Sequence, residues 1–433
     1  MGLRQENTGK CCESCKFLSR PIPVQDWDGT GKDFPYAYRN GTGQEWIASG
    51  QDGTGMECIL NTKSTANTEN VVKNVAISLL NRGEVGPNTS IQKVSGDYQS
   101  VLLDKIIELD EHLVTLLPDL KPDVIFVEHY RPIPAIELSG IPCVLMSIVN
   151  PLLKRSDTRL PPYLSGLLLT GGPAKWDAFR AVKSAQQSEG WRRIDDYMVS
   201  RGCQPMSDSP FTYNDKYLTP YGYPFELDFP PGVAQLPTNV IRLDHFMRAP
   251  EGIGYEIPVP LRDMPGKLVY FSLGSMGAID VVNMKRLVAI MAKSMHRFIV
   301  SMGPSHDEYV LPVNMWGQEF VPQIRVLPLV DLVITHGGYN STIETFCFGK
   351  PMIVMPLFAD QYDNAQRVQE SGLGLRLDPY RCSEHELLSA IDTLLNDKPL
   401  NEKLMKISQR IQTDNSLAKL PQIIADYVEN YVH

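Results

Sequence analysis

The stretch that decides the fold is residues 332–348, which read LVITHGGYNSTIETFCF. Leu332 to Thr335 is a short apolar run typical of a buried parallel strand, and Ile343 to Phe348 is compatible with a helix. Two glycines and the polar residues Asn340 and Ser341 lie between them. The pattern predicts a strand, a tight turn and a helix that is capped by Asn or Ser, with its first N–H groups facing an anion such as a diphosphate.

Further apolar runs surround this unit and are spaced by helix-sized segments. They are Lys267–Phe271, Arg297–Val300 and Met352–Met355. Strands that alternate with helices form a doubly wound parallel sheet, and ligands bind such sheets at the carboxyl ends of the strands. We therefore expect an α/β fold with a ligand site at one sheet edge.

The earlier part of the chain repeats this pattern more weakly. Val124–Val127 and Cys143–Ile148 are short apolar runs of a βαβ unit, and Val101–Leu117 carries apolar residues at the helical period until Pro118, which we expect to stop the helix. Residues 154–247 are helical at first and then rich in aromatic residues and proline. Those aromatic rings can line a pocket or simply pack in loops.

Polar residues gather where the predicted strands end. His336 can donate to a phosphate, Glu344 lies one helical turn after Asn340 and can reach a ribose diol, and residues after the strand 352–355 can read sugar hydroxyls. An aromatic residue and an amide upstream can hold a flat base. The candidate ligand-binding residues are Ser272, Gly274, Ser275, Phe320, Val321, Gln323, His336, Gly338, Asn340, Ser341, Glu344, Asp360 and Gln361.

The run from Phe320 to Asn364 resembles the signature of the family 1 UDP-glycosyltransferases, and the similarity extends over roughly residues 100–430. The resemblance implies a GT-B fold, in which two Rossmann-like domains face a cleft. It also implies transfer, with inversion, of a hexose, by family default glucose, from a UDP-sugar to a hydroxyl of a small lipophilic acceptor, as in detoxification. No cofactor or obligatory metal is implied.

The resemblance also assigns roles to the candidate residues. Phe320 and Gln323 would hold uracil, and Glu344 would hold the ribose. Asp360 and Gln361 would bind the sugar hydroxyls. The diphosphate would be held by His336, Asn340, Ser341 and Ser275.

On this basis the chain divides into five segments. They are a glycine-rich N-terminal segment (1–65), an acceptor-binding Rossmann-like domain (66–247), a linker (248–265), a UDP-sugar-binding Rossmann-like domain (266–415) and a C-terminal helix (416–433). The first segment contains three four-residue repeats, at 28–31, 40–43 and 52–55, in which Asp or Asn is followed by Gly-Thr-Gly. It shows neither the first strand nor the first helix of a Rossmann unit. The N-terminal domain is therefore expected to be incomplete or altered.

The catalytic side departs from the family pattern. The family's base is a histidine after the first strand, held by an Asp, but no histidine precedes His112. Glu128 resembles the Asp position and can orient a base or act as one, and His129 beside it is a substitute candidate. Two other functions therefore stay open: a catalytically impaired homologue that only binds nucleotide sugars, and an N-acetylglucosaminyltransferase of the lipid-intermediate type.

Composition narrows the range of partners and compartments. A net charge of -9 argues against nucleic-acid or anionic-membrane partners. No secretory signal or membrane span is readable, and a glycan on the sequon Asn340-Ser341-Thr342 would block the nucleotide site, so we expect a cytoplasmic protein. The cysteines Cys11, Cys12 and Cys15 lack a second ligand pair nearby, so no metal site is expected. The oligomeric state is left open.

Overall fold

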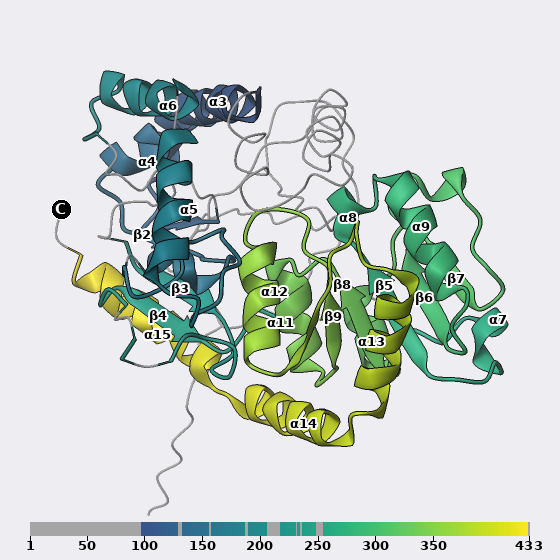
Figure 1. Cartoon of the computed structure of the whole chain (residues 1–433). Helices are drawn as coiled ribbons and strands as arrows, with labels where there is room; N and C mark the ends of the chain where they lie inside the picture. Colours follow the sequence, from purple (N-terminus) through teal and green to yellow (C-terminus); the bar gives the residue numbers. More distant parts are fainter. Residues whose placement is uncertain are drawn as a thin grey trace, which may run out of the picture.

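The computed structural model describes residues 97–128, 132–155, 157–186, 189–205, 217–230, 232–233, 236–247 and 254–431. The four-residue repeats, the three N-terminal cysteines and His129 lie outside these ranges. The described elements form two lobes (Figure 1). The C-terminal lobe comprises residues 259–413, and the N-terminal lobe comprises the described residues of 97–247 together with the last helix.

The centre of the C-terminal lobe is a six-stranded parallel sheet in the order β10-β9-β8-β5-β6-β7. Its strands are β5 (Leu268–Ser272), β6 (Arg297–Ser301), β7 (Met315–Gln318), β8 (Leu332–Thr335), β9 (Met352–Val354) and β10 (Gly374–Arg376). Every residue of β5, β8 and β9 is buried. The apolar runs predicted as strands are therefore the inner strands, as expected for a sheet covered on both faces.

The sequence pattern did not identify the two edge strands. β7 reads MWGQ and β10 reads GLR, and both are only partly buried. An edge strand pairs on one side only, so it needs no continuous apolar run and can contain glycine and polar residues. A reading based on apolar runs alone finds only the inner strands.

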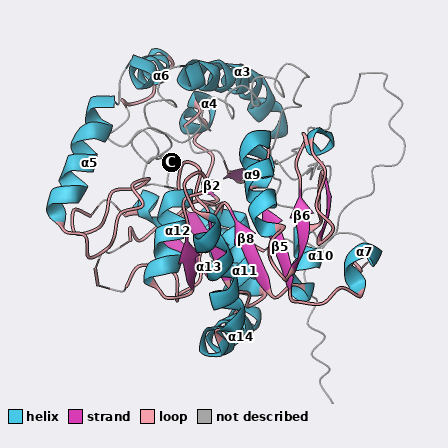
Figure 2. Ribbon diagram, turned by 45° about the vertical axis from the view of Figure 1, so that its right-hand side comes forward, coloured by secondary structure: helices cyan, strands magenta, loops and turns pink. Residues whose placement is uncertain are grey.

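Helices surround this sheet and bury its core, as the magenta strands between cyan helices in Figure 2 show. They are α7 (Val259–Arg262), α8 (Gly274–Gly277), α9 (Val281–Met291), α10 (Gln323–Val326), α11 (Tyr339–Cys347), α12 (Gln361–Glu370), α13 (Glu384–Asn396) and α14 (Lys398–Thr413). Short 3-10 turns occur at η3 (His306–Glu308) and η4 (Leu327–Leu329). β8 leads directly into α11 and β9 into α12, so both helices begin at the carboxyl edge of the sheet.

The described part of the N-terminal lobe contains four short parallel strands. They are β1 (Ile125–Val127), β2 (Cys143–Leu145), β3 (Thr219–Gly222) and β4 (Val240–Leu243). Isolated bridges join the β2 region to β3. The surrounding helices are α3 (Asp97–Leu120), α4 (Pro134–Leu138), α5 (Pro173–Gln186), α6 (Glu189–Ser200) and the turn η2 (Pro151–Lys154).

The end predicted for the first helix was wrong. α3 contains Pro118 and continues to Leu120, and Lys121 ends it with a φ of 46°. A proline removes one N–H, here the donor to the carbonyl of Val114. Because Val114 is 45% exposed, water can satisfy that carbonyl, and the helix tolerates the proline near its end.

The described aromatic rings of this stretch divide between the core and the surface. Tyr217, Tyr221 and Tyr223 are fully buried in the core, whereas Phe225 is 54% exposed. Phe211 and Tyr213 lie outside the described residues. For the three buried rings, packing is the role that the structure supports.

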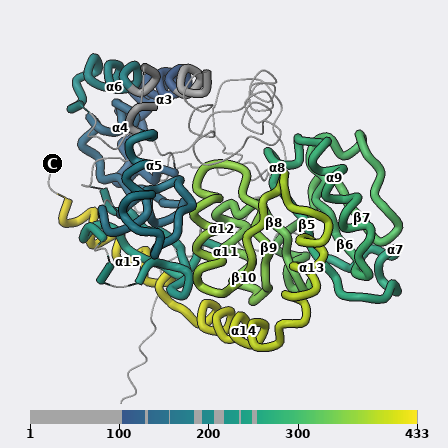
Figure 3. The backbone as a smooth tube through the Cα atoms, in the orientation of Figure 1, coloured from purple at the N-terminus to yellow at the C-terminus, as the bar shows by residue number. Residues whose placement is uncertain are grey.

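The last helix, α15 (Ser416–Glu429), returns to the N-terminal lobe, as the yellow end of the tube in Figure 3 shows. Its Leu420 and Ile424 pack with Val124 and Val144. The helix therefore crosses between the lobes and covers the strands of the first with the end of the chain.

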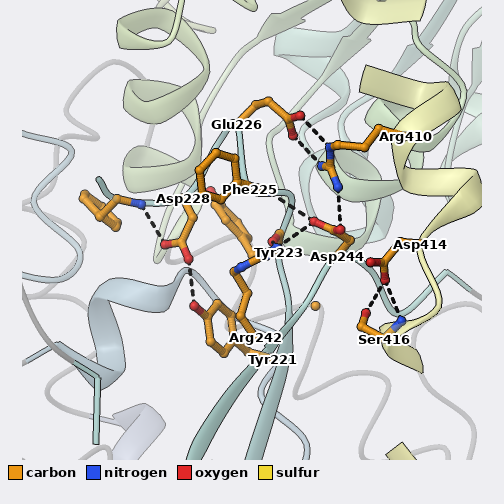
Figure 4. A network of polar contacts seen from close by, with 12 residues as sticks. Tyr221, Tyr223, Phe225, Glu226, Asp228, Arg242, Asp244, Arg410, Asp414 and Ser416 are labelled. Carbon is orange, nitrogen blue, oxygen red and sulfur yellow. Dashed lines mark hydrogen bonds and ion pairs between the residues drawn. The ribbon is translucent and has the colours of Figure 1, made fainter. Parts of the chain in front are cut away.

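A charged cluster reinforces this crossing near the end of α14. Arg410 donates to both carboxylate oxygens of Glu226, at 2.6 and 2.5 Å, and to Asp244 at 2.5 Å (Figure 4). Arg242 also pairs with Asp244. Asp244 is almost fully buried, so the two arginines compensate a charge that would otherwise be costly to bury.

Among the described residues, each helix is too short or too polar to cross a lipid bilayer.

Candidate nucleotide-sugar site

The turn between β8 and α11 is built for close approach to a ligand. Gly337 has a φ of 81°, and Gly338 is the N-cap of the nine-residue helix α11. A Cβ on Gly337 would lie 2.4 Å from Val354, and one on Gly338 would lie 2.4 Å from the ring of His336. Both positions therefore require glycine.

The predicted cap of this helix was wrong. The N-cap is Gly338, which has no side chain, and Asn340 and Ser341 lie inside the first turn. The first-turn N–H groups of α11 therefore have no side-chain cap, and together with the positive end of the helix dipole they can bind an anion. Asn340 is exposed at this end and Ser341 is partly exposed.

His336 lies between this turn and the loop after β5. A Cβ on Gly274 would lie 2.8 Å from the imidazole, so glycine with its φ of 71° makes room for the ring. Burial lowers the pKa of His336 to about 4, against a hydrogen bond to the backbone of Ser272 that raises it. The imidazole is therefore neutral near pH 7, and its one N–H is engaged with Ser272.

The loop after β5 completes this side of the site. The Ser272 hydroxyl accepts from the N–H of Gly274 at 3.2 Å, and Ser275 is exposed in the single turn α8. Gly274 of one loop and Gly338 of the other thus both lie against the imidazole of His336.

The candidate base and ribose residues touch one another. The amide of Gln323 donates to Glu344 at 2.5 Å and lies 3.4 Å from the hydroxyl of Ser341. Glu344 is buried in α11, whereas Phe320 is 53% exposed beside the buried Val321. Gln323, Ser341 and Glu344 therefore form a polar group that joins α10 to α11.

The candidate sugar residues begin α12 after a strained turn. Ala359 has a φ of 53°, which is unusual for a residue with a Cβ. The side-chain oxygen of Gln361 accepts from the backbone N–H groups of Leu357 and Phe358 at 2.9 and 3.2 Å. Gln361 therefore shapes the turn with its oxygen and keeps its NH₂ group for other contacts.

Asp360 is buried and is held from two sides. It accepts from the backbone N–H of Asn150 in the N-terminal lobe at 3.0 Å and from the side chain of Asn364 at 3.3 Å. Burial raises the pKa of Asp360 to about 6, against these hydrogen bonds, which lower it. A residue of the N-terminal lobe thus donates a hydrogen bond to the carboxylate of Asp360, the side chain predicted to bind the sugar.

Residues outside the predicted ligand set join the two lobes here. Asp363 accepts from the backbone N–H groups of Leu164 and Gly166 at 2.6 and 2.8 Å, and Arg376 donates to the Gly166 carbonyl. Tyr339 in α11 exchanges hydrogen bonds with the backbone of Gly222. Most of these partners are backbone groups, which no side-chain motif reveals.

Of the two candidate catalytic residues on the acceptor side, Glu128 is among the described residues. Glu128 lies directly after β1, and burial raises the pKa of its carboxyl. A raised pKa suits a group that exchanges a proton near neutrality. His129 lies outside the described residues.

The C-terminal part of the chain matches a known family. Residues 265–428 match the family model described as UDP-glucoronosyl and UDP-glucosyl transferase. The chain is 36% identical over 168 residues to UDP-glucuronosyltransferase 2B18 of Macaca fascicularis, covering 36% of this chain and 30% of that protein. It is 31% identical over 159 residues to UDP-glucuronosyltransferase 2B7 of Homo sapiens, with the same coverage. The match therefore spans less than a third of the length of these relatives.

Solved structures extend the similarity to both lobes. A glycosyltransferase of kitacinnamycin aligns with a TM-score of 0.61 at 19% identity, covering 77% of this chain and 84% of that one. CalG4, the calicheamicin glycosyltransferase, aligns with a TM-score of 0.52 at 17% identity, covering 78% and 83%. VinC, solved in complex with dTDP, aligns with a TM-score of 0.51 at 16% identity, covering 84% and 83%. At these identities the fold is what is shared.

The parallel sheets of the two lobes and these neighbours define the class: the chain has the GT-B fold of glycosyltransferases, as the sequence predicted. Its residues 265–428 are similar to the UDP-glucoronosyl and UDP-glucosyl transferase family, whose model they match.

Proposed function

We propose that this chain transfers a hexose, by family default glucose, from a UDP-sugar to a hydroxyl of a small lipophilic acceptor, with inversion at the anomeric carbon. The observation that carries the proposal is the convergence of the uncapped α11 terminus, His336 and the Gln323–Glu344 pair at one edge of the sheet. VinC, with the same fold, is solved with a nucleoside diphosphate bound, which supports a nucleotide ligand.

In this proposal the C-terminal lobe binds the donor. The first-turn N–H groups of α11 and the imidazole of His336 stabilise the negative charge that develops on the leaving UDP. Gln323 and Phe320 hold the base, Glu344 accepts from the ribose hydroxyls, and the turn at α12 binds the sugar. No metal or cofactor is required, because the helix terminus supplies the electrostatic stabilisation.

The acceptor hydroxyl must lose a proton as its oxygen attacks the anomeric carbon. We propose Glu128 for this step, either as the base or as the residue that orients His129. Glu128 follows the first described strand, and its raised pKa suits proton transfer. The acceptor itself is a small lipophilic alcohol or phenol. We further propose a cytoplasmic site of action, because a glycan on the exposed Asn340 would block the donor site.

A second function is favoured by one specific observation. The sequence holds no histidine before His112, so the family's usual base is missing. A chain with an intact donor site and no working base would bind UDP-sugars without transferring them.

One preparation of the full chain distinguishes the two functions. UDP binding is measured by calorimetry, and transfer of glucose from UDP-glucose to a phenolic acceptor is measured in parallel. We expect both binding and transfer. Binding without turnover would refute the enzyme and leave the binding protein, and absence of UDP binding would refute the donor site itself.

A further inference from the structure

Asn364 lies at the centre of the donor side and was not among the candidate ligand residues. It is fully buried in α12, one helical turn after Asp360. Its NH₂ group donates to the Gly337 carbonyl at 2.9 Å and to the carboxylate of Asp360 at 3.3 Å. Its oxygen accepts from the NH₂ of Asn150 at 2.9 Å and from the hydroxyl of Tyr223 at 3.0 Å.

A carboxamide has two N–H donors and two acceptor lone pairs, and all four are used here. The two N–H donors bond within the C-terminal lobe, one to the turn before α11 and one to the carboxylate of Asp360. The two lone pairs point to the N-terminal lobe. An aspartate at position 364 would lack the donors and repel Asp360, so the pattern requires an amide at this position.

The N-terminal partners form a linked group around the same carboxylate. The side chain of Asn150 also donates to the hydroxyl of Tyr223 at 3.2 Å, and its backbone N–H donates to Asp360. Asn150 therefore touches Asp360 directly and, through Asn364, a second time. Tyr223 is itself fully buried, so this group excludes water.

We propose that Asn364 is a positioning residue that fixes Asp360 for the donor sugar and makes that orientation depend on the N-terminal lobe. This inference rests on the proposed function, because it assumes that Asp360 contacts the sugar. The carboxylate keeps its orientation only while Asn364 holds it on one side and Asn150 on the other. Binding of the sugar then depends on contact between the N-terminal lobe and α12. The residues proposed for uracil and ribose lie outside this hydrogen-bonded group.

The test compares the dissociation constants of UDP-glucose and UDP by calorimetry on the full chain. Asn364→Ala should weaken UDP-glucose binding about tenfold. It should raise the ratio of the dissociation constant of UDP-glucose to that of UDP about fivefold, because the sugar contact is lost in addition to any change at the phosphates. Tyr223→Phe keeps the ring and removes one hydroxyl, so it should raise the ratio about twofold.

Asn314→Ala is the matched control. Asn314 is also a buried asparagine, but its amide donates to the carbonyls of Met291 and His296, before the first residue of β7. This variant should lower the melting temperature and leave the ratio unchanged.

The outcomes separate the inference from the proposed function. If the wild type binds no UDP, the proposed function fails and the inference with it. If the wild type binds both ligands but Asn364→Ala and Tyr223→Phe leave the ratio at the wild-type value, the inference alone is overturned, and Asn364 is a structural residue like Asn314.

Discussion

The two lobes present polar groups at the carboxyl ends of parallel strands in different ways. In the C-terminal lobe, β8 and β9 run within a few residues into α11 and α12, so His336 and Asp360 are fixed by helix starts. In the N-terminal lobe, β1 ends at Val127, directly before Glu128, and β2 is followed by a loop that carries Asn150 to α12. The comparison indicates that helix starts within the C-terminal lobe fix the residues proposed for the phosphates, whereas the N-terminal lobe acts through a loop that reaches Asp360.

The largest expected effect lies on the N-terminal side of this comparison. Glu128→Gln should lower the rate of glucose transfer by roughly 100-fold or more, because it removes the carboxylate proposed for proton transfer. UDP affinity should not change. Steady-state transfer and calorimetry on the same variant check both statements, with Glu256→Gln as a control at an exposed glutamate. A Glu128→Gln variant that lost UDP affinity would show that the assignment of roles to the lobes is wrong.

The next effect lies on the donor side. His336→Ala should weaken UDP binding by about 1.5 to 3 kcal/mol, because it removes a hydrogen bond to a charged phosphate. His385→Ala, at an exposed position of α13, should leave binding unchanged. Unaltered UDP affinity in the His336 variant would remove this residue from the donor site.

The pH dependence of binding sharpens the role of the same imidazole. In the free protein the pKa of His336 is about 4, and its one N–H is engaged with Ser272. Donation to a phosphate therefore requires a second proton, and the phosphate charge raises the pKa in the complex. Binding then takes up a proton, so affinity rises as pH falls, by at most about tenfold per pH unit.

UDP-glucose is the ligand for this titration, because it has no terminal phosphate of its own to titrate. Its affinity should increase between pH 8 and pH 6 for the wild type. His336→Gln can donate without titrating, so its slope should be smaller. Equal slopes for the two proteins would show that His336 does not take up the proton.

The smallest expected effect concerns the crossing between the lobes. Arg410→Met should lower the free energy of unfolding by about 1 kcal/mol, because the ion pairs with Glu226 and Asp244 are lost, the guanidinium is partly exposed, and Arg242 still pairs with the buried Asp244. Urea denaturation measures this change. A loss of UDP affinity comparable to that of His336→Ala would contradict this expectation. It would mean that the ion pairs near the end of α14, and not the start of α11 alone, organise the donor site.

The sequence predicted the parts of the fold that depend on local patterns. Leu332–Thr335 and Met352–Val354 are buried on both faces, so their apolar runs were readable, and His336, Gly338 and Glu344 follow from the glycine turn. β7 and β10 are edge strands without such a run. The cap was assigned to Asn340 or Ser341, whereas the helix already begins at Tyr339, before these polar residues, so Gly338 is the N-cap.

The contacts between the lobes could not be predicted from the sequence. Asn150 reaches Asp360 through a backbone N–H, and a backbone donor has no sequence signature. Asn364 offered a weak signal, because it lies four residues after Asp360 on one helix face. Its other partners, Asn150 and Tyr223, are distant in the chain, so only the fold brings them together.

The proposed function requires a nucleoside diphosphate to bind at the start of α11. Hydrogen exchange with and without UDP tests it directly. We expect slower exchange in a peptide spanning residues 336–344 and unchanged exchange in a peptide from α3. Binding of UDP without protection of residues 336–344 would contradict the proposed donor site.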